Sequence, residues 1–207
     1  MSGGRWSEKM MAACEWVMRI VLLNLLWLGL TVLGLGILGG GPATAAVYAV
    51  TRKWVQGETD VPLFATCWQT YRAEFGKANA LGWITAIAGF ILFMDYQFFL
   101  AQQGVIYSVL RVIITAFGLA YVVIAVNLFP VFVHYDIRFL QCFKFAFFIG
   151  FAKPLHTLGM AVGVAAMVAL TLVFPVLFPL CAISGSSFWV MRLANRSFQT
   201  IEKRKQA

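Results

Sequence analysis

Long stretches of apolar residues, separated by short basic segments, make up most of this sequence. The hydrocarbon core of a bilayer is about 30 Å thick, and a helix needs about 20 apolar residues to cross it. Four stretches are long enough: Ile20–Leu38, Ala80–Ala101, Val105–Val133 and Leu155–Leu193. We expect the last to form two spans folded at Pro175 and Pro179, because proline cannot donate a hydrogen bond within a helix. The pattern predicts an all-α, polytopic transmembrane helix bundle with five long spans.

Basic residues lie almost entirely between these stretches, and they predict the topology. Fifteen of the 16 Lys and Arg residues fall into four flanks: Arg5, Lys9 and Arg19; Arg52, Lys53, Arg72 and Lys77; Arg138, Lys144 and Lys153; Arg192, Arg196, Lys203, Arg204 and Lys205. The links at residues 102–104 and around Pro175 contain none. Because loops rich in Lys and Arg stay in the cytoplasm, five spans would separate the first flank from the others. A sixth membrane element would place all fifteen on the cytoplasmic side.

The candidate for this sixth element is residues 42–56, whose apolar part is Pro42–Thr51, directly after Gly39–Gly41. Its ten apolar residues reach only about 15 Å as a helix. We therefore expect a short, tilted or re-entrant helix packed among the others. Six membrane elements with both termini in the cytoplasm is the favoured topology. Five spans with the N-terminus outside is the alternative.

Amphipathic segments between the spans are expected to form cytoplasmic interfacial helices. Aromatic residues recur at helical intervals of four, three and four: Phe64, Trp68, Tyr71 and Phe75. Residues 137–152 are similar, and the N-terminal stripe Trp6, Met10, Cys14 and Val17 has the same spacing. Such faces either lie in the headgroup region or dock onto the bundle. We treat residues 1–207 as a single integral membrane domain, in which residues 20–101 and 105–193 suggest a weak duplication.

Composition excludes a soluble domain, since 61% of the residues are hydrophobic and 12% are charged, against about 45–50% and about 25% in soluble proteins. The net charge of +8 therefore indicates orientation and contact with anionic phospholipid at the cytoplasmic face, and not nucleic-acid binding. Four scattered cysteines and two histidines predict no metal site. No nucleotide, metalloprotease or serine-hydrolase motif is present, so we expect neither an enzyme nor a cofactor.

Asp95 and Arg111 are the charges that lie deep in the long spans. Each lies eight residues from a turn centred near Gln103, which places them at matching depth on adjacent antiparallel helices. Charged groups within a membrane are costly and usually have a partner. The two are interpreted as an intramembrane polar pair: either a structural salt bridge or snorkelling side chains, or part of a solute or ion pathway.

Eleven residues between Asn24 and Asn79 resemble the N-terminal signature of YesL-like proteins. These are small bacterial integral membrane proteins of unassigned biochemical function. The residues that carry the resemblance are Asn24, Trp27, Gly41, Pro42, Ala43, Thr44, Ala45, Tyr48, Arg52, Lys53 and Asn79. The resemblance implies a multi-pass protein of the bacterial cell membrane. It also implies an accessory role near carbohydrate uptake of the ABC type, because family members often accompany such systems in gene clusters. It supplies no catalytic or ligand-binding residues.

Two functional hypotheses follow. The first is a non-enzymatic accessory or partner of a carbohydrate ABC transporter, with transporter subunits as its protein partners. The second is a self-contained small-solute transporter or channel with Asp95 and Arg111 in its pathway.

Overall fold

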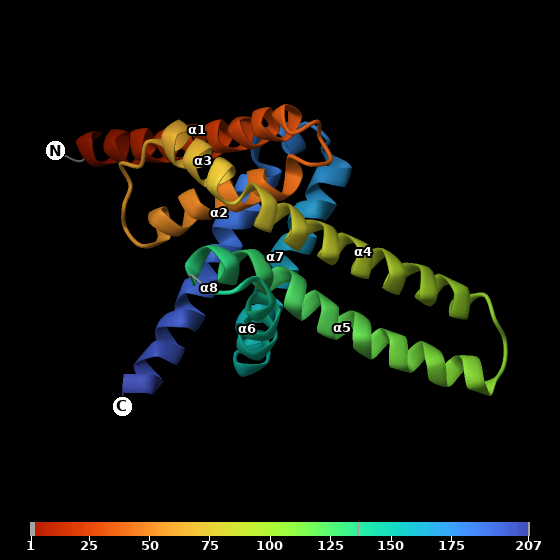
Figure 1. The fold of residues 1–207 in the computed structure, drawn as a ribbon. Helices are drawn as coiled ribbons and strands as arrows, with labels where there is room; N and C mark the ends of the chain where they lie inside the picture. Colours follow the sequence, from red (N-terminus) through yellow and green to blue (C-terminus); the bar gives the residue numbers. More distant parts are fainter. Residues whose placement is uncertain (1–2, 136, 207) are drawn as a thin grey trace.

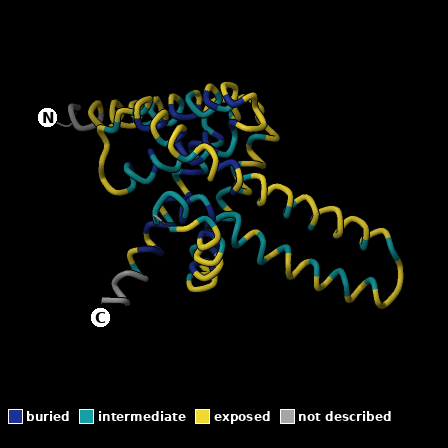
Figure 2. Tube along the Cα trace, in the orientation of Figure 1, coloured by how far each residue is buried: buried dark blue, intermediate teal, exposed yellow. Residues whose placement is uncertain are grey.

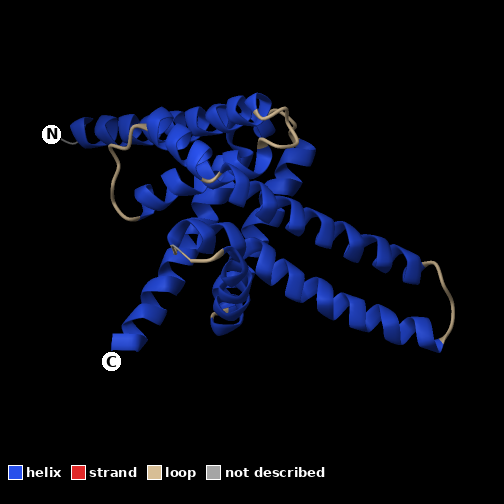
Figure 3. Ribbon diagram, in the orientation of Figure 1, coloured by secondary structure: helices blue, strands red, loops and turns tan. Residues whose placement is uncertain are grey.

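The computed structural model describes residues 3–135 and 137–206, and in these residues the regular structure is entirely helical (Figures 1 and 3). Side chains are described for residues 7–135 and 137–200, so Arg5, Trp6, Lys203, Arg204 and Lys205 lie outside them. The helices are α1 (Gly3–Leu33), α2 (Gly40–Val55), α3 (Leu63–Ala73), α4 (Phe75–Leu100), α5 (Val105–His134), α6 (Phe139–Ala152), α7 (Pro154–Val173), the π-helix η1 (Phe178–Ala182) and α8 (Ile183–Gln206). The predicted all-α helix bundle is confirmed.

Four of the described helices are long and apolar enough to cross a membrane: Ser7–Leu33 of α1, α4, α5 and α7. The structure has four such helices where the sequence predicts five. The difference lies in the second half of Leu155–Leu193, which forms η1 and the start of α8. Because α8 runs on through Arg192 and Arg196 to Gln206, it combines a short apolar part with a basic one.

The first span also differs from its predicted bounds of Ile20–Leu38. Helix α1 begins at Gly3, so the N-terminal stripe belongs to the same helix as the span, and its Met10, Cys14 and Val17 are exposed. The helix ends at Leu33 because the chain then turns, with positive φ at Leu35 and Gly36. Glycine adopts this left-handed backbone readily, and the glycine-rich turn leads directly into α2.

Helix α2 corresponds to the expected short element and forms the centre of the molecule. It packs against α1, α3, α4, α5 and α8, and it is largely buried (Figure 2). Small side chains make this possible, since Ala43, Ala45 and Ala46 are fully buried and let the neighbouring helices approach closely. Helix α2 is thus a short helix packed among the others, as expected from its length.

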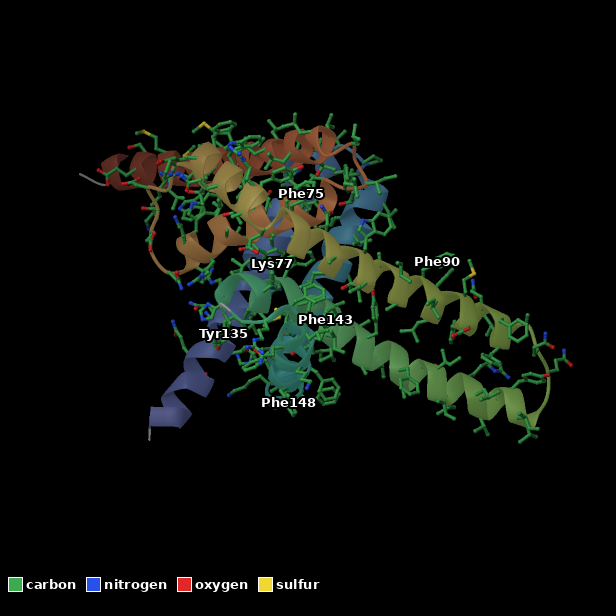
Figure 4. All side chains as sticks on the ribbon, viewed as in Figure 1. Phe75, Lys77, Phe90, Tyr135, Phe143 and Phe148 are labelled. Carbon is green, nitrogen blue, oxygen red and sulfur yellow. The ribbon has the colours of Figure 1, made fainter. Side chains whose placement is uncertain are left out.

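Two hydrophobic clusters flank α2. One joins it to α1 and α3 through Leu23, Leu30, Val47, Trp54 and Tyr71. The other joins α4, α5, α6, α7 and α8 through Leu81, Leu128, Cys142, Met160 and Phe198. The aromatic helices α3 and α6 thus dock onto the bundle with one face, while Phe64 on α3 remains exposed. Phe148 on α6 is exposed as well (Figure 4).

The α4–α5 hairpin extends away from this centre (Figures 1 and 2). Its apolar side chains are exposed on both helices, including Phe90, Phe98, Val112 and Phe117. No residue in the most apolar part of either helix is buried. In a bilayer this hairpin presents its surface to lipid or to another membrane protein.

Asn24 joins the first helix to the break between α7 and α8. Its side chain is fully buried, and its Nδ2 donates to the carbonyl of Phe178 at 2.8 Å. Its Oδ1 accepts from the backbone N–H groups of Ile183 and Ser184, both at 3.1 Å. The helix is interrupted at residues 174–176, around Pro175 as predicted, whereas Pro179 lies within η1. Asn24 bonds to backbone groups of this irregular segment.

We predict that Asn24→Ala lowers the free energy of unfolding by about 2 kcal/mol, because interhelical hydrogen bonds in membranes are worth about 0.6 kcal/mol on average and here three are lost. Thermal unfolding in detergent micelles measures the change. Leu25→Ala, at a neighbouring half-exposed position, is the control. Equal melting midpoints for the two variants would contradict the assigned role of Asn24.

Cys67 gives a second test of the packing. It lies on α3 with 1% of its surface exposed, and burial raises the pKa of its thiol to about 12. Because the thiolate is the reactive form, we predict no maleimide labelling of Cys67 at pH 7.5 in the folded protein and full labelling after denaturation. Ala65→Cys, at an exposed position of the same helix, should label without denaturation. Both are measured in chains whose other cysteines are replaced by serine.

Candidate functional site

A polar hollow of about 720 Å³ opens between the end of α2, helix α3, the start of α4 and the end of α5. Figure 4 labels two residues that line it, Lys77 on α4 and Tyr135 just after α5. Its polar lining consists of Arg52, Lys53, Gln56, Glu58, Thr66, Gln69, Thr70, Glu74, Lys77, His134 and Tyr135. Pockets of roughly 300–1,000 Å³ are the size that small-molecule ligands occupy. This hollow is therefore large enough for a small organic molecule.

Arg52 is the fixed element of the hollow. It lies in the last turn of α2, and its Nη1 donates to the backbone carbonyl of Val133, in the last turn of α5, at 2.7 Å. Its Nε is enclosed and has no hydrogen-bond acceptor among the described residues. A guanidinium group has five N–H donors in a rigid plane. The bond to Val133 thus orients the guanidinium group of Arg52 and leaves its other N–H donors available to a ligand.

The other charges of the hollow are only partly compensated. Glu74 lies 3.6 Å from Lys77, and Glu58 is exposed on the link after α2. That link is held by Arg19 of α1, which donates to the carbonyl of Thr59 at 2.6 Å. Among the described residues no acidic group lies within ion-pair distance of Arg52 or Lys53. The hollow thus presents two basic groups without acidic partners beside two carboxylates.

Most residues of the predicted signature gather around α2. Gly41 contacts α4 so closely that an added Cβ would lie 2.7 Å from the carbonyl oxygen of Ala78. Trp27 on α1 donates from its Nε1 to the hydroxyl of Thr44 at 3.1 Å. The Tyr48 ring stacks on Phe129 of α5, with centroids 5.8 Å apart. Pro42, Ala43 and Ala45 are buried within the same helix. These residues position α2, and only Arg52 and Lys53 line the polar hollow.

A second hollow, of about 370 Å³, lies beside the α2–α4 crossing. Gly41, Thr44 and Asn79 line it together with Trp83 and Phe129. Asn79 is 9% exposed, and its Oδ1 has no hydrogen-bond donor in the protein. Of the signature residues, Arg52 and Lys53 thus line the polar hollow at one end of α2, and Gly41, Thr44 and Asn79 line the apolar hollow at the other.

The structure does not join Asp95 to Arg111. Among the described residues the ion pairs are Arg19–Glu15, Arg19–Asp60 and Lys77–Glu74. Asp95 is exposed on α4. Arg111 donates from its Nη2 to the hydroxyl of Ser108 at 2.9 Å, while its Nε is enclosed without an acceptor. Neither residue lines the hollows described above.

Comparison with known proteins shows the family. A family model described as a protein of unknown function, DUF624, matches residues 20–96. Three Bacillus subtilis proteins are similar over nearly the whole chain, and all three are described as uncharacterized. YteU is 36% identical over 94% of this chain and 87% of its own length. YesL is 35% identical (93% and 91%) and YesV is 34% identical (95% and 94%).

The chain belongs to this YesL-like DUF624 family. The resemblance stated from the sequence is thereby confirmed, and with the four apolar helices it identifies a helical membrane protein. No solved structure matches the chain.

Sequence reasoning located Arg52 and Lys53 but not the hollow they line. In the sequence, the charge of Arg52 indicates only which side of the membrane it lies on. Its fixed orientation depends on the carbonyl of Val133, which is 81 residues away in the chain. Gln69 and Thr70 carry no distinguishing sequence signal, because polar residues on an amphipathic helix ordinarily face water.

The two neighbouring glycines of α2 allow a matched test of the crossing. We predict that Gly41→Ala destabilises the protein, because its Cβ would meet the backbone of Ala78 and Asn79. Overpacking of this kind costs typically about 1–3 kcal/mol. Gly40→Ala should be neutral or stabilising, since nothing lies within 4 Å of its Cβ position. Melting midpoints in detergent distinguish the two, and a larger loss for Gly40→Ala would contradict the described crossing.

Proposed function

We propose that this protein is a non-enzymatic accessory subunit of a carbohydrate uptake system of the ABC type. The observation that carries the proposal is the unpartnered Asp95 on the exposed α4–α5 hairpin. Its carboxylate makes no hydrogen bond or ion pair with the described residues. It lies among the exposed apolar side chains of Phe93, Met94, Tyr96 and Phe98.

A charged group in this setting favours a partner from outside the chain. Ionised side chains within membrane spans almost always face a bundle interior, a cavity or an opposite charge. The α4–α5 hairpin provides none of these around Asp95, so contact with the helices of another membrane protein would supply what the chain lacks. A permease subunit is the partner that the family resemblance implies.

The absence of nucleotide and catalytic motifs supports an accessory role rather than an enzymatic one. The hypothesis of a self-contained transporter requires a pathway past Asp95 and Arg111. Neither residue lines either hollow at α2, and no ion pair joins them. We therefore keep the accessory role as the single proposal.

We also propose that both termini lie in the cytoplasm. In Figure 1 the start of α1 and the end of α8 lie on the left, whereas the turn at residues 34–39 lies to the right of them and the turn at residues 101–104 lies at the far right. These turns contain no charged residue, whereas Arg52 and Lys53 lie in the last turn of α2 and Arg138 lies directly before α6. This distribution supports a cytoplasmic, anionic-lipid-facing end at Arg52, Lys53 and Lys144.

Copurification tests the partner. We predict that the tagged protein at native expression level recovers permease or ATPase subunits of a carbohydrate transporter. Asp95→Asn should reduce the recovery at least fivefold, because the amide cannot replace the charge in a partner's ion pair. Glu8→Gln, at an exposed acid outside the hairpin and outside the polar hollow, is the matched control and should recover as much as the wild type.

Two outcomes would contradict the proposal. One is that no transporter subunit is recovered by any of the three proteins. The other is undiminished recovery with Asp95→Asn, which would mean that the carboxylate reaches the headgroup region and needs no protein partner.

A further inference from the structure

We propose that the polar hollow at the end of α2 is a binding site for a phosphate ester that carries hydroxyl groups. Two sources have this chemistry: the headgroup of phosphatidylglycerol, or a free polyol or sugar phosphate. The site is independent of the accessory role proposed above, because it involves neither Asp95 nor the outer part of the hairpin.

The phosphate end of the site is formed by Arg52 and Lys53. The bond from Arg52 Nη1 to the carbonyl of Val133, 2.7 Å long, holds the guanidinium in one orientation. Its enclosed Nε has no acceptor in the protein, and Lys53 adds an ammonium group from the next position of α2. An oriented guanidinium beside a second cation is the arrangement that recognises phosphate oxygens.

The charges of the helix ends are consistent with this assignment. The last turns of α2 and α5 both meet at the hollow, and the negative ends of the two helix dipoles point toward it. Arg52 offsets this potential at both helices, since it lies in the last turn of α2 and donates to the last turn of α5. Lys53 then remains as a cation without an acidic partner among the described residues.

The hydroxyl end of the site is formed by groups that accept or exchange hydrogen bonds. Ionised carboxylates only accept, and hydroxyl groups of a polyol are suitable donors to them. Glu58 and Glu74 line the hollow together with the side-chain amides of Gln56 and Gln69 and the hydroxyl of Thr70. Arg19 fixes the link that carries Glu58, through its bond to Thr59.

This mixed lining distinguishes the ligand from a bare anion. The described residues of the lining contribute three cations (Arg52, Lys53 and Lys77) and two carboxylates (Glu58 and Glu74). Inorganic phosphate would engage the cations but leave the carboxylates unused. At about 720 Å³ the hollow also far exceeds a phosphate ion and accommodates a phosphate with an attached polyol.

The test uses the full-length protein in detergent micelles, with the melting midpoint followed at constant ionic strength. Glycerol 3-phosphate, inorganic phosphate and glycerol are titrated separately as soluble probes. Phosphatidylglycerol and phosphatidylcholine are added to the micelles as lipid probes, since both have the phosphodiester but only the first has free headgroup hydroxyls. We expect saturable stabilisation by glycerol 3-phosphate, by phosphatidylglycerol, or by both, and this comparison identifies the source.

Three variants connect the effect to the hollow. Lys53→Gln should weaken binding of the stabilising probe at least tenfold. It removes no described contact, so the variant should fold as the wild type does. Glu58→Ala should reduce the affinity for the polyol phosphate to that for inorganic phosphate. Lys144→Gln, which removes an exposed cation on α6 outside the hollow, is the charge-matched control and should bind normally.

The proposal is overturned if neither glycerol 3-phosphate nor phosphatidylglycerol stabilises the protein saturably. It is equally overturned if inorganic phosphate binds as tightly as the polyol phosphate in the wild type, or if Lys53→Gln and Lys144→Gln weaken binding to the same extent. The copurification of transporter subunits has a separate readout, so either proposal can fail while the other stands.

Discussion

The close packing of five helices around α2 is the constraint on which the rest of the structure depends. Interhelical attraction within a membrane comes from contact between surfaces and from hydrogen bonds, because lipid is as apolar as the side chains it would replace. A central helix therefore needs small side chains where its neighbours contact it. Helix α2 has Ala43, Ala45 and Ala46 at such positions. Gly41 allows α4 to approach at backbone distance. The same packing directs the last turn of α2 toward the end of α5, where Arg52 and Val133 meet.

The hydrophobic pattern predicted best those helices that are apolar on every face, namely α4 and α5. The bounds expected for the two helices of the hairpin, Ala80–Ala101 and Val105–Val133, come close to those of α4 and α5. The pattern was less informative at α1 and α8, which combine an apolar part with a basic one in a single helix. An apolar residue excludes water, but it does not distinguish lipid from a neighbouring helix. The short length of α2 predicted that it packs among other helices, whereas nothing in the sequence predicted that the α4–α5 hairpin is exposed on both helices.

The candidate sites show a similar division. Arg52 and Lys53 could be selected from the sequence as unusual basic residues at the end of an apolar element, yet their charge indicated only a side of the membrane. The hollow exists because α2, α3, α4 and α5 bring separate polar residues together, and no local pattern encodes that juxtaposition. Asp95 and Arg111 show the opposite case. Their matching depth was readable from the sequence, whereas the direction of each side chain around its helix was not, and Arg111 bonds to Ser108 on its own helix.

The clamp formed by Asn24 has a consequence for biogenesis. Its three backbone partners, at residues 178, 183 and 184, lie about 160 positions later in the chain, with separations of 154 to 160. During synthesis and insertion, α1 enters the bilayer first. The Asn24 side chain then lacks its native hydrogen-bond partners until η1 and α8 have been inserted. Such a long-range contact closes late. The contacts of Asn24 with η1 and α8 therefore form only when the last part of the chain is in place, and a chain that stops before residue 178 leaves the Asn24 amide without these partners.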